Sequence, residues 1–140
     1  MNILLVEDNP TDILLAREAL KKIEIDHSLH VVEDGEAALK YLSQEDGFNG
    51  CPRPDCILLD LNLPRKNGRE VLAEIKSVEL LKTIPVIVFS TSDAPDDIES
   101  AYKLHANCYL VKPSNFDRCV AAFNTLLNFW WNLVELPDHE

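Results

Sequence analysis

Short apolar runs alternate with segments of helical periodicity along the whole chain. Between the runs, apolar residues recur every three or four positions, as in Ile13, Ala16 and Leu20, which predicts helices. The runs themselves predict five buried strands, at residues 3–6, 27–32, 56–60, 85–89 and 108–111. Regular alternation of strands and helices predicts an α/β fold, a doubly wound parallel sheet of five strands with five helices.

The last predicted helix carries more apolar surface than contact with one sheet requires. From Cys119 to Val134 the sequence has no charged residue, and its apolar side chains form two adjacent stripes spanning roughly 200° of arc. We expect one extended helix from Phe116 to Leu136, which runs beyond the sheet. Exposed aromatic residues at helical spacing predict a homodimer interface. The residues expected in it are Phe123, Leu126, Phe129, Trp130, Leu133 and Val134.

Composition limits the classes of partner. The 140 residues include 24 acidic and 13 basic ones, a formal net charge of −11, and their number suits one domain. This acidity disfavours binding to nucleic acid or to an anionic membrane surface. The uncharged stretch near the C-terminus is shorter than the roughly 20 residues of a transmembrane helix. The N-terminus lacks the features of a signal peptide and the four cysteines lack metal-site spacing, so we expect a cytoplasmic protein with reduced thiols.

Polar residues with matching chemistry follow four of the predicted strands. Glu7 and Asp8 follow the first strand, Asp60 ends the third, Ser90 follows the fourth and Lys112 follows the fifth. The carboxyl ends of parallel strands meet at one edge of the sheet, where ligands bind. Grouped carboxylates suit Mg²⁺, and an aspartate nucleophile with a hydroxyl and an ammonium group suits phosphoryl transfer. The sequence therefore predicts a magnesium site with Asp60 as phosphoryl acceptor.

These residues alone leave other functions open. A small Mg²⁺-dependent aspartyl-phosphate hydrolase of the haloacid dehalogenase type would use the same nucleophile. Its signature needs a second carboxylate two residues later, where this chain has Asn62, and a cap domain for which 140 residues leave no room. A flavin carrier would need a phosphate-binding turn after the first strand, but residues 7–10 are acidic and lack glycine. A pure dimerisation module would use the C-terminal helix and none of the strand-end residues.

Four motifs in order resemble the receiver domain of two-component response regulators, the CheY-like family. The similarity covers Ile3 to about Leu127 and implies a flavodoxin-like fold. The motifs are Val-Glu-Asp-Asn at 6–9, Leu-Leu-Asp-Leu-Asn-Leu-Pro at 58–64 followed by Gly68, Pro-Val-Ile-Val-Phe-Ser at 85–90, and Tyr-Leu-Val-Lys-Pro at 109–113.

The resemblance implies a role for the acidic residues. Asp60 would accept a phosphoryl group from a histidine kinase. Mg²⁺ would be held by Glu7, Asp8 and Asp60, together with the backbone carbonyl of Asn62. The protein would then be a phosphoacceptor that assists its own phosphorylation and dephosphorylation, not an enzyme in the usual sense.

The resemblance also assigns residues near the ends of the last two strands. Ser90 and Lys112 would contact the phosphoryl oxygens. Ser90 and Tyr109 would form the conformational switch, in which the tyrosine changes rotamer on activation. A cis peptide bond is expected before Pro113.

The domain organisation follows from the same comparison. Residues 1–128 are expected to form the receiver domain and residues 129–140 an aromatic extension that supports dimerisation. No output domain is expected, so signalling would pass through protein partners. The extension and the long loop at 43–54 are similar to the small response regulators that serve cyanobacterial phytochromes, which implies a phytochrome as the partner kinase.

Overall fold

A five-stranded parallel sheet forms the centre of the protein. The computed structural model describes residues 1–137, and the strand order is β2-β1-β3-β4-β5. The central strand β3 pairs with β1 and β4, as in the pairs Ile3 with Cys56 and Ile57 with Val86. The strands are β1 (Asn2–Val6), β2 (Ser28–Val32), β3 (Cys56–Leu59), β4 (Val86–Ser90) and β5 (Cys108–Val111).

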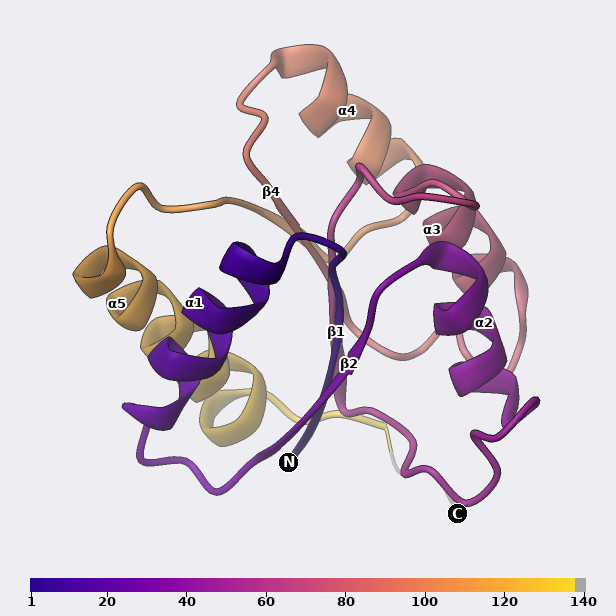
Figure 1. Ribbon diagram of the computed structural model, residues 1–140, viewed down its shortest axis with the longest axis horizontal. Helices are drawn as coiled ribbons and strands as arrows, with labels where there is room; N and C mark the ends of the chain where they lie inside the picture. Colours follow the sequence, from indigo (N-terminus) through magenta and orange to yellow (C-terminus); the bar gives the residue numbers. More distant parts are fainter. Residues whose placement is uncertain (138–140) are drawn as a thin grey trace.

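Five α-helices within residues 1–137 cover the two faces of this sheet. Figure 1 shows α1 and α5 on one face and α2, α3 and α4 on the other, so the doubly wound α/β fold is confirmed. Each of α1 to α4 connects two parallel strands, which requires a crossover over one face, and α5 follows the last strand. The helices are α1 (Pro10–Lys21), α2 (Gly35–Ser43), α3 (Gly68–Ser77), α4 (Pro95–Lys103) and α5 (Phe116–Leu127).

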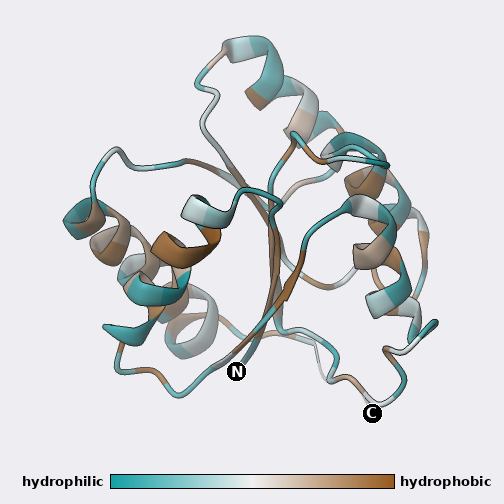
Figure 2. Cartoon of the chain, in the orientation of Figure 1, coloured by the Kyte–Doolittle hydropathy of each residue, from teal (hydrophilic) through white to brown (hydrophobic). Residues whose placement is uncertain are grey.

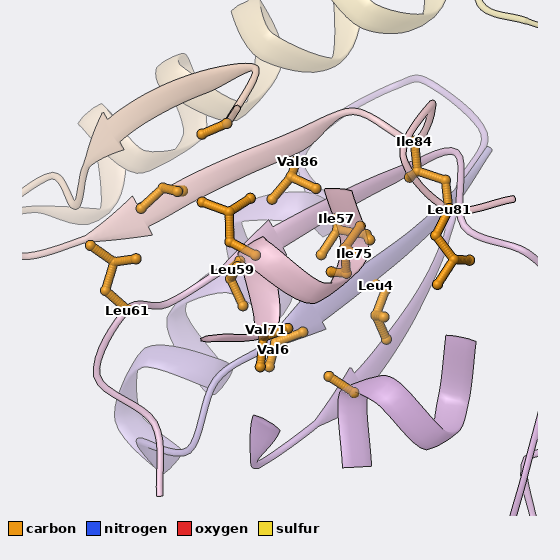
Figure 3. Close-up of a cluster of buried hydrophobic side chains, with 14 of the residues drawn as sticks. Leu4, Val6, Ile57, Leu59, Leu61, Val71, Ile75, Leu81, Ile84 and Val86 are labelled. Carbon is orange, nitrogen blue, oxygen red and sulfur yellow. The ribbon is translucent and has the colours of Figure 1, made fainter. Parts of the chain in front are cut away.

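Alternation along the strands divides the core into two clusters. In β1, Leu4 and Val6 face α2 and α3, whereas Ile3 and Leu5 face α1 and α5, because successive strand side chains point to opposite faces. Figure 3 shows the first cluster, with Leu4 and Val6 directed toward the side chains of α3. Figure 2 shows hydrophobic residues along the strands and hydrophobic residues interspersed with hydrophilic ones in the helices. Both faces of the sheet are therefore buried, as continuous apolar strands predict.

The C-terminal segment differs from the predicted single helix from Phe116 to Leu136. The α-helix ends at Leu127, and a π-helix, η1, continues over Asn128–Leu133. The backbone is extended at Val134. Residues 138–140, the end of the expected extension, lie outside the described residues.

Asparagine side chains accompany this change of helix type. The side-chain amide of Asn128 donates to the backbone carbonyl of Asn124 at 2.7 Å, so that carbonyl is shared with a side chain. At the end of η1, the N–H of Val134 bonds to the carbonyl of Phe129, five residues earlier. This wider turn breaks the regular spacing on which the two-stripe prediction depended.

The prediction that Phe123 belongs to a dimer interface is wrong. Phe123 is fully buried in the monomer, where its ring lies 5.3 Å from that of Phe89, because α5 turns this side chain toward β4. Leu126 and Trp130 are partly buried, whereas Phe129 and Leu133 are 44% and 74% exposed. Exposed apolar surface in the predicted interface is therefore found at Phe129 and Leu133, whereas Phe123 belongs to the core.

None of the helices in residues 1–137 has the length and apolar character needed to cross a lipid bilayer. The four cysteines all lie in this described part and carry free thiols, as expected. Burial raises the pKa of the Cys56 thiol to about 12, which makes it an unreactive core residue.

Candidate functional site

Three carboxylates meet at the carboxyl edge of the sheet. Glu7 and Asp8 follow β1 and Asp60 follows β3, and since these strands are neighbours, one oxygen from each residue lies within 4.8 Å of the others. Glu7 and Asp60 are buried, whereas Asp8 is exposed. Carboxylate oxygens of this spacing, without nearby sulfur or imidazole ligands in the cluster, suit a hard divalent cation such as Mg²⁺. The residues therefore fit the metal that the sequence predicted.

The buried carboxylate of Glu7 is electrostatically unfavourable without a cation. Its pKa is raised to about 7, mainly because burial desolvates the carboxylate and also because Asp60 lies nearby, although the hydrogen bond from Lys112 lowers it. Its Oε2 atom accepts the backbone N–H groups of Asp8 and Asn9 at 3.1 and 3.2 Å. The side chain is thus fixed in place, with a charge that a metal ion would stabilise.

Lys112 brings a cation to this cluster from the end of β5. Its ammonium nitrogen lies 2.5 Å from Glu7 and 3.5 Å from Asp60. Burial lowers the pKa of Lys112, but hydrogen bonds to Asp12 and Glu7 and the charge of Asp60 outweigh that effect, so the net shift is upward. Lys112 is therefore held charged beside the proposed acceptor.

Asp12 is a site residue that the sequence reasoning missed. Its carboxylate accepts a hydrogen bond from Lys112 at 2.8 Å. In the sequence it looks like an ordinary acidic residue in the first turn of α1, whose N-cap is Asn9. Only the placement of that turn beside the loop after β5 reveals the contact.

The loop after Asp60 closes tightly on this residue. The N–H of Asn62 donates to Asp60 Oδ1 at 3.3 Å, and the N–H of Gly68 donates to the carbonyl of Leu61 at 2.9 Å. A Cβ atom at Gly68 would lie 2.2 Å from the backbone oxygen of Asp60, which the structure cannot accommodate without movement. Glycine is therefore required where α3 begins behind Asp60.

Ser90 and Tyr109 are linked through the loop that follows β4. The side chain of Ser90 is buried at the end of β4, and its Oγ accepts the N–H of Ser92 at 3.2 Å. The hydroxyl of Tyr109 donates to the carbonyl of Ser92 at 2.9 Å. Both predicted switch residues therefore form a hydrogen bond with Ser92, Ser90 with its N–H and Tyr109 with its carbonyl.

A further set of polar contacts holds this loop to α3 and α4. The Ser92 hydroxyl donates to Asp97 Oδ2 at 2.5 Å, and the Arg69 guanidinium forms an ion pair with the other oxygen of Asp97. Arg69 also donates to the hydroxyl of Ser100 at 3.3 Å. We name Ser92, Asp97 and Arg69 the loop anchor.

The expected cis peptide bond before Pro113 is wrong for this structure. No cis peptide occurs among the described residues, so the bond between Lys112 and Pro113 is trans. Trans is the lower-energy isomer of a bond to proline, by about 0.5–1 kcal/mol. Lys112 makes its contacts with Glu7, Asp12 and Asp60 from this conformation.

An apolar groove of about 710 Å³ lies apart from the acidic cluster, along β5 and α5. It includes three residues of the predicted dimer interface, Leu126, Phe129 and Trp130. Its remaining lining comes from Asn107, Cys108, Leu110, Ala121, Ala122 and Thr125.

Comparison with known proteins agrees with this geometry. The family model described as the response regulator receiver domain matches residues 3–124. The chain is 49% identical over 135 residues to the response regulator Rcp1 of Synechocystis, covering 96% of this chain and 92% of Rcp1.

Solved structures give the same result. The crystal structure of the Mn²⁺-bound form of Rcp1 has a TM-score of 0.89 at 48% identity, covering 98% of this chain and 99% of that one. The phosphorylated cyanobacterial phytochrome response regulator RcpA has a TM-score of 0.91 at 49% identity, with 98% of both chains covered. A Pseudomonas aeruginosa receiver domain with magnesium in its active-site cleft has a TM-score of 0.74 at 28% identity, covering 92% of this chain and 95% of that one.

Proposed function

Because this chain belongs to the response regulator receiver domain family, we propose that its Asp60 accepts a phosphoryl group from a histidine kinase in a Mg²⁺-dependent reaction. The observation that carries the proposal is the convergence on Asp60 of two further carboxylates and the ammonium group of Lys112. This arrangement supplies both a metal site and a cation at the oxygen that would be modified.

Glu7, Asp8 and Asp60, with the backbone carbonyl of Asn62, would hold the Mg²⁺ ion. When bound, the ion neutralises negative charge on the acceptor and on the transferred group. The three carboxylates supply oxygen ligands of the type that Mg²⁺ prefers, and the raised pKa of Glu7 reflects the charge that the ion would compensate.

The chain's own residues carry out the transfer. A carboxylate oxygen of Asp60 attacks the phosphorus of the phosphohistidine, the P–N bond breaks, and its electron pair returns to the imidazole ring. Lys112 contacts the phosphoryl oxygens as a compact charge. The Ser90 hydroxyl turns inward to donate a hydrogen bond, and Tyr109 follows as the linked loop moves. The same groups assist hydrolysis of the acyl phosphate, so the chain influences both its own phosphorylation and its dephosphorylation.

The partner kinase is a phytochrome. Two similar proteins support this assignment, since RcpA is a cyanobacterial phytochrome response regulator and Rcp1 matches nearly the whole chain. Phosphotransfer from a panel of radiolabelled histidine kinases tests it. Label should reach this chain fastest from a phytochrome kinase with Mg²⁺, and neither EDTA-treated protein nor Asp60→Asn should accept it. Faster transfer from an unrelated kinase would contradict the phytochrome assignment, and labelled Asp60→Asn would contradict the acceptor.

The chain forms a homodimer through the apolar groove and η1. Leu126, Phe129 and Trp130 line the groove, and the neighbouring Leu133 is exposed, with Val134 following it. A surface of this kind is typical of protein interfaces, and about 800 Å² per partner would suffice for a stable one. Sedimentation equilibrium at micromolar concentration should give a dimer that Phe129→Glu converts to monomer. A wild-type monomer would contradict the dimer.

Residues 1–128 act as the receiver and residues 129–140 as the interface extension, and output passes through protein partners in the cytoplasm. The net charge of −11 supports the absence of nucleic acid or anionic membrane from these partners. The free thiols support a reducing compartment.

A further inference from the structure

We propose that Asp12 is a positioning residue that competes with the phosphoryl group for Lys112 and thereby limits how far Asp60 is phosphorylated. The proposal rests on the proposed function, in which Lys112 binds the phosphoryl oxygens of Asp60. It adds a residue that lies outside the predicted metal ligands, acceptor and switch.

The contacts of Lys112 define the competition. An ammonium group has three N–H donors, and two of them are used in hydrogen bonds to Glu7 and Asp12. Asp60 lies at 3.5 Å, close enough for attraction but farther than either hydrogen-bonded carboxylate. In the unphosphorylated protein the ammonium nitrogen of Lys112 is therefore nearer to the Asp12 carboxylate, at 2.8 Å, than to that of Asp60, at 3.5 Å.

The position of Asp12 separates it from the metal ligands. Its carboxylate is not part of the cluster in which oxygens of Glu7, Asp8 and Asp60 lie within 4.8 Å of one another. A cation bound in that cluster would therefore leave Asp12 with Lys112 as its partner. Among residues 1–137, Lys112 is the one residue with which the Asp12 carboxylate forms a hydrogen bond or ion pair.

Charge determines the direction of the effect. Phosphorylation replaces the single negative charge of Asp60 by a phosphoryl group that carries about two. Asp12 and Asp60 both lie within 3.5 Å of the Lys112 nitrogen, so the new charge arises close to the Asp12 carboxylate. Asp12 repels the phosphoryl group and also retains the cation that would neutralise it. Its removal should therefore favour the phosphorylated state.

Asp12→Asn is the test variant because it removes the charge with little change in shape. Asp12→Glu restores a carboxylate on the same turn. Asp117→Asn is the matched control, since Asp117 is the acidic residue in the first turn of α5 and shares the helix N-terminal environment without a contact to Lys112. Thermal unfolding followed by circular dichroism checks each fold, and Asp12→Ser replaces Asp12→Asn if that variant does not fold.

The measurement is the phosphorylated fraction by intact mass at a fixed, subsaturating concentration of acetyl phosphate with Mg²⁺. Asp12→Asn should raise the ratio of phosphorylated to free protein about two- to five-fold, the range expected for a partly exposed ion pair. Asp12→Glu and Asp117→Asn should match wild type. A merely structural role would lower the melting temperature of Asp12→Asn without raising this ratio.

Each other outcome overturns the inference. An unchanged ratio in Asp12→Asn would show that Asp12 does not compete for Lys112. A lowered ratio would show that Asp12 holds Lys112 in its productive position instead. A wild-type protein that gains no phosphoryl group would overturn the proposed function and this inference together. If wild type is phosphorylated and Asp12→Asn gives the same ratio, only the inference is overturned.

Discussion

The hydroxyl of Tyr109 donates a hydrogen bond to the backbone carbonyl of Ser92 at 2.9 Å, while the N–H of Ser92 bonds to Ser90. One loop residue therefore connects the two predicted switch residues. Movement of Ser90 toward a phosphoryl group would pull on the same peptide that holds the tyrosine hydroxyl. The coupling of these residues has a direct structural path of two hydrogen bonds.

Tyr109→Phe should loosen this loop. Loss of one hydrogen bond should lower the free energy of unfolding by about 1 kcal/mol, as measured by urea denaturation. Hydrogen exchange of residues 91–94 should become faster in the unphosphorylated protein.

Tyr41→Phe is the control for Tyr109→Phe. The Tyr41 hydroxyl also donates to a backbone carbonyl, that of Pro52, at 3.0 Å. In Tyr41→Phe we expect a similar loss of unfolding free energy, but no faster hydrogen exchange at residues 91–94. Equal exchange in this loop for both variants would argue against a specific role for Tyr109.

Arg69→Ala should weaken the loop anchor. The ion pair of Arg69 with Asp97 is partly shielded, with side chains 38% and 34% exposed. We expect a loss of about 0.5–1 kcal/mol in the free energy of unfolding and faster exchange at Ser92. Lys103→Ala removes the more exposed pair with Glu99 and should cost less. An equal loss in the two variants would show that Arg69 makes only a surface ion pair.

The stability of the metal-free protein should depend on pH through Glu7. Its pKa is raised from 4.5 to about 7 in the folded state, first by burial and then by Asp60. Between these two pH values the unfolded chain loses this proton while the folded protein keeps it, so stability should fall as pH rises through the interval. Above about pH 7 both states are ionised and the decline ends.

Glu7→Gln isolates this contribution because glutamine does not titrate. From pH 5 to pH 8 in EDTA, wild type should lose about 1–3 kcal/mol of unfolding free energy relative to Glu7→Gln. Mg²⁺ at pH 8 should then stabilise wild type more than the variant, because the ion binds the folded state. A difference between the two proteins that does not change with pH would contradict the assigned pKa.

Truncation of Phe123 should affect the stability of the monomer, whereas truncation of Phe129 should affect association. Phe123→Ala should lower the free energy of unfolding by about 3–5 kcal/mol, since its ring is fully buried beside Phe89. Phe129→Ala should leave monomer stability within about 1 kcal/mol of wild type and weaken association, because 44% of this residue is exposed. Urea denaturation and sedimentation equilibrium separate the two effects. A large loss of monomer stability in Phe129→Ala would contradict its place in the interface.

The site residues at the strand ends could be predicted from sequence, because the parallel topology brings these chemically matched side chains to one edge of the sheet. Apolar strands are buried on both faces, and the parallel order follows from their alternation with helices. Glu7, Asp60 and Lys112 then reach one edge whatever the detailed packing. This part of the site depends on backbone topology, which the hydrophobic pattern specifies.

The sequence did not reveal the contacts of three residues, Asp12, Arg69 and Phe123. These contacts depend on tertiary packing, which the hydrophobic pattern does not specify. Asp12 and Arg69 are ordinary first-turn or surface residues until the tertiary structure places Lys112 and Asp97 beside them. Phe123 belongs to an apolar stripe whose inward side is decided by the rotation of α5. The change to a π-helix at Asn128 involves side-chain hydrogen bonds that helical periodicity does not register.

Intact mass after incubation with acetyl phosphate and Mg²⁺ tests the central claim most directly. Wild-type protein should gain the mass of one phosphoryl group, and both EDTA and Asp60→Asn should abolish the gain. Ser92→Ala, which changes the neighbouring loop but not the acceptor, should still be modified. An equal gain in Asp60→Asn, or rapid release of phosphate by wild type without an adduct, would contradict the assignment of Asp60 as a stable phosphoryl acceptor.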